Sequence, residues 1–116
     1  MYYGGVLIMS FNDKNIDITK NIKVIEWLKS ELLMAVASLY ELLVKGIQNS
    51  YDAVLDGISN IILVAYLLGK RLGLSYENID SKVEEKAKLA LVEDHKIEQW
   101  YGDLGSLHEY LKRKRG

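Results

Sequence analysis

Apolar residues recur at every third or fourth position over the first part of this 116-residue chain, which is the period of an amphipathic α-helix. We therefore predict a long helix that begins near Lys20 and ends at Gly46. A polar, turn-like segment precedes it at residues 10–19, where Asp17 or Thr19 can cap the helix. The apolar series consists of Ile22, Ile25, Leu28, Leu32, Ala35, Leu39, Leu42 and Leu43.

Two features of the sequence predict close contacts between helices. The second half of the first helix, residues 32–44, is apolar nearly all round, so we expect other helices or a second subunit to cover it. Gly57 and Gly69 lie inside the next apolar segment, where glycine costs up to about 1 kcal/mol relative to alanine. Each is expected to allow close approach of another helix or of a ligand.

A second helix is predicted from a cap at Ser50 to near Gly73, after a short connection. Asp52, Asp56 and Asn60 fall in it at i, i+4 and i+8, so they line one narrow stripe. A carboxylate among so many apolar neighbours is costly unless it is paired, hydrated or bound to a cation. The stripe is therefore a candidate cation and phosphate site. The alternative is a polar stripe held by hydrogen bonds or solvated along a groove.

The rest of the chain predicts a third helix and a short last one. Residues 75–78 form a turn and cap, residues 95–105 lack a regular pattern, and Asp103 or Ser106 begins the last helix. The inner face of the third helix comprises Ile79, Val83, Ala87, Ala90 and Leu91. No alternating pattern lasts long enough for a sheet. The expected fold class is all-α, with two long antiparallel helices as a hairpin, a third helix packed against them and a C-terminal cap.

Length and composition fit a single soluble domain over residues 1–116. Residues 1–19 are expected to be a leader and polar segment, residues 20–96 the helical core, and residues 97–116 a cap with a basic tail. Within the first segment, Met9 can be the biological start after a translated leader at residues 1–8. The alternative for that leader is an N-terminal strand or arm.

Composition also narrows the partners. The net charge of −1 provides no basic field for bulk nucleic-acid binding, and the absence of cysteine excludes disulfides and thiolate metal sites. The most apolar run, residues 61–68, is far shorter than the ~20 residues of a membrane-spanning helix. We expect a cytoplasmic protein with no membrane partner. The basic tail at residues 112–115 leaves open a third, weaker possibility, which is that the protein binds nucleic acid through this tail.

Several short motifs occur in a fixed order between residues 20 and 90. Lys45-Gly46 follows the first helix, and Asp52-Ala-Val-Leu-Asp56-Gly-Ile opens the second. Arg71-Leu-Gly-Leu ends the second helix, and Val83-Glu-Glu-Lys lies in the third. This order resembles the MazG family of all-α nucleoside triphosphate pyrophosphohydrolases.

The resemblance implies an activity and a cofactor. Members of the family hydrolyse nucleoside triphosphates between the α and β phosphates, and Mg²⁺ is held by carboxylates on facing helices. The family pattern has ExxE on the first helix and ExxD on the second. Here Asp56 matches the aspartate, whereas Ala53 stands at the second glutamate. Ala35 and Ser38 stand at the first pair.

The implied metal site is therefore altered. It would comprise Asp56, with Asp52, Glu41 and Glu31 as neighbouring acids, and substrate would meet Asn60, Lys70 and Arg71. No catalytic base is assigned. The alternatives are surface ion pairs for the two glutamates, and cations that complement a helix C-terminus for Lys70 and Arg71.

Two functions follow from the sequence. The first is a MazG-like homodimer or larger homo-oligomer that binds a nucleoside triphosphate through Mg²⁺ near Asp56, with weakened pyrophosphohydrolase activity. The second is a non-catalytic helical scaffold that acts by self-association or partner binding.

Overall fold

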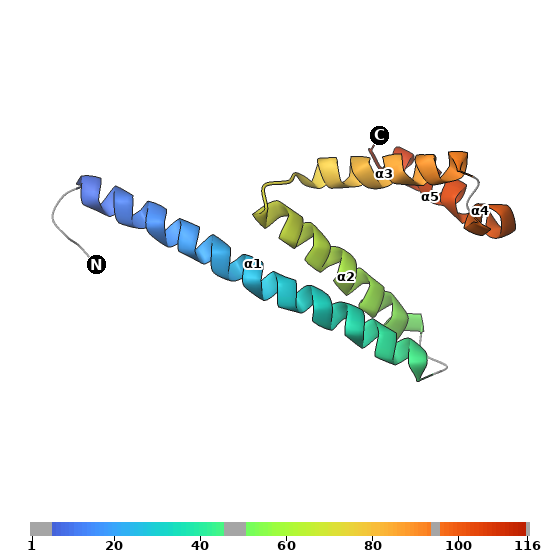
Figure 1. The fold of residues 1–116 in the computed structure, drawn as a ribbon, viewed down its shortest axis with the longest axis horizontal. Coiled ribbons are helices and arrows are strands. Elements are labelled where there is room, and N and C mark those ends of the chain that lie inside the picture. The colour runs from blue at the N-terminus through green and yellow to red at the C-terminus, as the bar shows by residue number, and fades with distance from the viewer. Residues whose placement is uncertain (1–5, 46–50, 94–95, 116) are drawn as a thin grey trace. The chain divides into compact units, whose positions relative to one another are not determined.

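The computed structural model describes residues 6–45, 51–93 and 96–115, and every regular element in these ranges is a helix (Figure 1). The helices are α1 (Val6–Val44), α2 (Tyr51–Arg71), α3 (Tyr76–Val92), α4 (Lys96–Tyr101) and α5 (Asp103–Arg115). The predicted all-α fold class is confirmed.

The chain divides into two compact units, residues 1–73 and residues 74–116. The first unit contains α1 and α2, and the second contains α3, α4 and α5. The predicted packing of the third helix against the hairpin concerns the relation between these units and stays a prediction.

Helices α1 and α2 form the predicted antiparallel hairpin (Figure 1). Near its closed end, Gly57 lies against Leu39. At its open end, the Asn21 side-chain amide donates to the Arg71 carbonyl oxygen at 3.2 Å, and Arg71 Nη1 donates to Asn21 Oδ1 at 3.3 Å. The Gly57–Leu39 contact and the Asn21–Arg71 hydrogen bonds together show that the two helices run antiparallel.

A heptad seam holds the hairpin together. Buried and half-buried residues alternate at spacings of three and four on both helices, as in a coiled coil with positions a and d at the contact. On α1 the a positions are Ile25, Leu32 and Leu39, and the d positions are Leu28, Ala35 and Leu42. On α2 the a positions are Val54, Ile61 and Leu68, and the d positions are Gly57 and Val64.

Gly57 sets the register of this seam. A Cβ atom at this position would lie 3.2 Å from Leu39 Cδ1, so the predicted close approach of a second helix is confirmed here. Since the helices are antiparallel and share the heptad spacing, Leu32 is then level with Val64. Gly69 is buried within α2.

Helix α1 begins earlier than the sequence predicts. It starts at Val6 rather than near Lys20, so the turn-like segment at residues 10–19 and its caps are wrong. No proline or glycine interrupts residues 6–45, and asparagine and aspartate each cost less than about 0.7 kcal/mol in a helix. The predicted roles of Gly46 and Ser50, and residues 1–5 of the expected leader at residues 1–8, lie outside the described residues. Residues 6–8 of that leader belong to α1, so they do not form the strand that was the alternative.

In the second unit, α3 begins as predicted. Ser75 is its N-cap, because the Ser75 Oγ accepts a hydrogen bond from the Asn78 backbone N–H at 3.0 Å. Helix α3 contacts α5, with Ala87 and Leu111 buried. Val83 is 41% exposed, so its assignment to the inner face is only partly correct.

The end of the chain is more regular than predicted. Helix α4 occupies part of the stretch that was expected to be irregular, and α5 begins at Asp103, the first of the two predicted starts. Gly102 separates the two helices with φ of 69°, a conformation that favours glycine.

Helix α2 is long and apolar enough, by length and composition alone, to cross a membrane. The sequence prediction considered only the shorter apolar run at residues 61–68. Core helices of soluble proteins share this property.

Candidate functional site

The seam divides the surface of the α1–α2 hairpin into two sides. Positions c and g lie to one side of the a/d seam and positions b and e to the other, and in antiparallel helices the same letters share a side. We call the c/g side the acid-bearing side. It carries Glu31, Ser38, Glu41 and Lys45 on α1, and Asp56, Asn60 and Lys70 on α2.

Most of the predicted site residues therefore share one side of the hairpin. Two residues do not follow this arrangement. Asp52 occupies position f, on the part of α2 that faces away from α1. Arg71 occupies a d position at the open end of the seam, where it binds Asn21.

The register separates these residues along the helix axes. Glu41 is level with Leu55, so it lies at almost the same height as Asp56, on the other helix. Glu31 is level with Ala65, about 14 Å along the axis from Asp56 at 1.5 Å per residue. Lys70 is about 21 Å from Asp56 by the same measure. Glu41 and Asp56 thus share a level along the hairpin, whereas Glu31 and Lys70 lie at other levels.

The acids do not form a metal-binding group within the described residues of one chain. No three His, Cys, Asp or Glu side chains in these ranges lie close enough to hold a metal ion. Asp56 and Glu41 are both exposed. A site at this level would therefore offer two carboxylates from facing helices, and the remaining ligands would have to come from elsewhere.

Glu41 already has a partner. Its Oε1 lies 3.0 Å from Lys45 Nζ, one turn along α1, and both side chains are well exposed. Such a surface pair contributes little stability, since exposed pairs measure about 0–1 kcal/mol. It matches the surface ion pair that the sequence left open for this glutamate.

The two positions on α1 at which the family has glutamates differ in burial. Ala35 is 5% exposed at a d position in the seam, so a carboxylate there would be buried between the helices. Ser38 is exposed at a g position. It lies about 3 Å along the axis from the level of Asn60, which occupies a g position on α2. Ser38 is therefore a polar residue on the same side of the hairpin as the candidate site.

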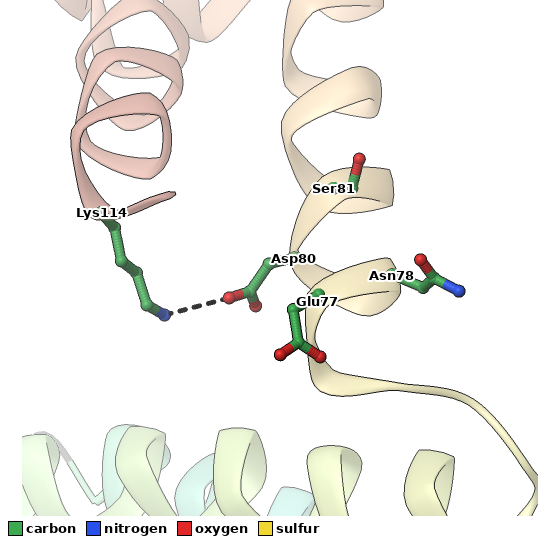
Figure 2. A pocket seen from close by; sticks show the side chains of 5 residues that line it. All are labelled: Glu77, Asn78, Asp80, Ser81 and Lys114. Carbon is green, nitrogen blue, oxygen red and sulfur yellow. Dashed lines mark ion pairs between the residues drawn. The ribbon is translucent and has the colours of Figure 1, made fainter. Parts of the chain in front are cut away.

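A second group of polar residues joins α3 to α5. Lys114 Nζ lies 3.4 Å from Asp80 Oδ2, and Figure 2 shows the two side chains extending toward each other beside Glu77. His108 Nε2 lies 3.7 Å from Glu84 Oε1. Glu84 and His108 lie on different helices, so no spacing within one segment of the sequence indicates this pair. These pairs hold two helices together rather than form a metal group.

One surface ion pair in this unit also lowers the pKa of a glutamate. Lys82 Nζ lies 2.9 Å from Glu85 Oε2 on the outside of α3. The hydrogen bond and charge of Lys82 lower the pKa of Glu85 below its ordinary value of 4.5. The pair is exposed and lies in the other unit from the acid-bearing side, so we assign it no part in the candidate site.

The chain is thus an all-α protein with a helical hairpin that carries carboxylates on one side. The model of the MazG-like family matches residues 18–104, well over half of the chain. The chain therefore belongs to the MazG-like family, and the resemblance predicted from residues 20–90 is confirmed. Comparison with curated proteins and with solved structures gave no significant match.

Proposed function

We propose that this MazG-like protein is cytoplasmic and binds a nucleoside triphosphate through Mg²⁺ on the acid-bearing side of its hairpin. It would release pyrophosphate from the bound nucleotide at a reduced rate. The observation that carries the proposal is the common level of Glu41 and Asp56 on two facing helices. Mg²⁺ is often bound through one or two carboxylates together with phosphate oxygens, so this pair fits the cation.

Each residue has a limited role in this proposal. Asp56 is the central ligand, because it matches the family aspartate, and Glu41 approaches from α1. Asp52, one turn before Asp56, can add negative charge at the rim. Asn60 can donate its side-chain amide to a phosphate or sugar oxygen. Mg²⁺, when bound, would neutralise phosphate charge and activate a water molecule.

Three substitutions relative to the family pattern explain why we expect the rate to be reduced. Ala35, Ser38 and Ala53 stand where the family has glutamates, so only one of the four acids is retained. A cation held by fewer carboxylates is bound more weakly and positioned less well. Glu31 lies too far along α1 to replace a missing acid near Asp56, and Lys70 and Arg71 could meet only a distant part of the ligand.

Pyrophosphate release from a panel of ribo- and deoxyribonucleoside triphosphates with Mg²⁺ tests the proposal. Asp56→Asn keeps the shape of the side chain and removes its charge, so we expect release to fall at least about tenfold. Asp103→Asn is the matched control, because Asp103 is also exposed but lies in α5. It should release pyrophosphate at the wild-type rate.

A gain-of-function variant sharpens this test. Ala53→Glu restores the family ExxD spacing around Asp56 at a half-buried g position on the acid-bearing side. We expect it to raise the rate of pyrophosphate release. Equal rates in the wild type, Asp56→Asn and Ala53→Glu, at equal thermal stability, would contradict the proposal.

The second candidate function is a non-catalytic scaffold. It is favoured by the finding that no metal-binding group exists among the residues that the structure describes. The two functions differ in nucleotide binding, which isothermal titration with Mg²⁺ and a non-hydrolysable triphosphate measures directly. If the chain neither releases pyrophosphate nor binds the nucleotide, the scaffold becomes the favoured function.

A further inference from the structure

Lys45 lies beside the two acids of the candidate site. Its backbone N–H donates to the Glu41 carbonyl oxygen at 3.1 Å, so the last turn of α1 continues to this residue and places it at a g position. By the register set at Gly57, Lys45 is about 8 Å along the axis from Asp56, toward the closed end of the hairpin. Lys70 is about 21 Å from Asp56 in the opposite direction. Of these two lysines on the acid-bearing side, Lys45 is the one near the proposed Mg²⁺ ligands.

A triphosphate at this level needs a cation from the protein. Glu41 and Asp56 are both negative, and a triphosphate that carries one Mg²⁺ is still an anion, so these groups repel one another. An ammonium group among them offsets this repulsion and donates strong hydrogen bonds to phosphate oxygens. The cations that the sequence predicts for this role are placed elsewhere. Lys70 lies at another level, and Arg71 is bound at the open end of the seam.

Glu41 holds the Lys45 ammonium group close to the site in a contact that a ligand can reach. Lys45 Nζ lies 3.0 Å from Glu41 Oε1, and the two side chains are 61% and 69% exposed. Exposed pairs of this kind are weak, so the lysine can exchange its partner at little cost. A carboxylate that binds a metal ion attracts an ammonium group less strongly. Lys45 would then turn to a phosphate oxygen.

A cavity on the surface of α1 has a size and lining suited to phosphates. It is lined by Ser38, Glu41, Leu42 and Lys45, and its volume is about 270 Å³. The lining offers an ammonium group, a hydroxyl group and a carboxylate. Pockets for drug-sized ligands measure roughly 300–1,000 Å³, so this cavity suits a phosphate chain better than a whole nucleotide.

The opposite direction along the acid-bearing side is suited to a base. Met34 on α1 and Leu63 on α2 both occupy c positions at nearly the same level, and they are 61% and 54% exposed. This level is about 10 Å along the axis from Asp56, on the side away from Lys45. Methionine sulfur makes favourable contacts with aromatic rings, and leucine provides apolar surface for their faces. The acids therefore have a cation on one side and exposed apolar groups on the other.

We propose that Lys45 binds the terminal phosphates of a nucleoside triphosphate. The ligand lies along the acid-bearing side, with its phosphates toward the closed end of the hairpin and its base toward Met34 and Leu63. This inference rests on the proposed function, and it adds a substrate-binding residue and a direction for the ligand. The Lys45–Glu41 pair separates on binding, because the two side chains contact different parts of the ligand.

A second lysine pair on α1 provides a matched control. Lys29 Nζ lies 3.0 Å from Glu26 Oε2, and the two side chains are 58% and 64% exposed. This pair occupies e and b positions, on the other side of the hairpin from the acids. Lys45→Gln and Lys29→Gln therefore remove the same charge and a similar ion pair, but only the first removes it from the candidate site.

Titration calorimetry of the full chain with Mg²⁺ and a non-hydrolysable nucleoside triphosphate compares these variants. Lys45→Gln should raise the dissociation constant about tenfold, because it removes a charge-assisted hydrogen bond to phosphate. Lys29→Gln should bind as the wild type does. Circular dichroism of each variant establishes that its helices are intact.

Inorganic tripolyphosphate with Mg²⁺ tests the direction of the ligand, because this probe has phosphates but no base. Lys45→Gln should weaken the binding of tripolyphosphate by the same factor as that of the nucleotide. Leu63→Gln should weaken the binding of the nucleotide and leave that of tripolyphosphate unchanged. The reverse pattern, with Lys45→Gln affecting only the nucleotide, would overturn the inference.

The outcomes distinguish this inference from the proposed function on which it rests. Equal affinities of the wild type and Lys45→Gln for the nucleotide would overturn the role of Lys45 and leave the proposed function standing. Equal losses in Lys45→Gln and Lys29→Gln would do the same, because they would indicate a general effect of charge. A wild-type chain that binds no nucleotide with Mg²⁺ would overturn both.

Discussion

At position 57 a single hydrogen in place of a side chain determines how closely the two long helices approach. A methyl group there would make one tight contact, at 3.2 Å with Leu39 Cδ1, which is the end of a flexible side chain. Alanine gains about 1 kcal/mol of helix propensity over glycine, and a small rotation of Leu39 relieves the contact. We therefore expect Gly57→Ala to raise the free energy of unfolding by about 0.5 kcal/mol.

A larger side chain at the same position should have the opposite effect. Gly57→Leu overfills the seam and should lower the free energy of unfolding by about 1–3 kcal/mol. Urea unfolding followed by circular dichroism measures both variants. A loss of more than 1 kcal/mol in Gly57→Ala would mean that the helix backbones are closer than the Leu39 contact indicates.

The residue scale also shows why the candidate site was harder to predict than the seam. The heptad of α1 is visible in the sequence, because large apolar residues mark it directly. The common level of Glu41 and Asp56, and the distance of Glu31 from both, depend on the register between two helices. No spacing within either helix encodes that register, so the sequence identified all the acids without showing which of them share a level.

At the scale of one element, the start of α3 rests on its N-cap. The Ser75 Oγ accepts a hydrogen bond from the Asn78 N–H, which would otherwise have no partner in the helix. Ser75→Ala should lower the free energy of unfolding by about 1 kcal/mol, whereas Ser75→Asp should retain the cap. Thermal unfolding of the two variants measures this, and equal losses would contradict the capping role.

Element boundaries follow the same logic of local signals. The cap of α3 was predictable because serine, the turn and the apolar series agree in sequence. The start of α1 was misplaced because polar residues at 10–19 suggested a turn, although they contain neither glycine nor proline. Helix α4 was missed because six residues are too few to display a helical period.

At the scale of the whole molecule, the homo-oligomer that the sequence predicts would make stability depend on concentration. If a second copy binds only the folded chain, association stabilises the fold by mass action. For a chain of this length we expect the unfolding midpoint to rise by about 3 °C for each tenfold increase in protein concentration. Differential scanning calorimetry over a hundredfold range measures this, and a constant midpoint would contradict it.

The two-sided hairpin also restricts how the gene can change in length. Each residue turns an α-helix by about 100°, so one deletion between Gly57 and Ile62 would rotate everything after it. Residues of the acid-bearing side would then turn toward the seam. Only insertions or deletions of whole heptads, matched in α1 and α2, preserve both the seam and the acid-bearing side. Among homologues, we expect the hairpin to vary in steps of seven residues, while point substitutions accumulate freely at its f positions.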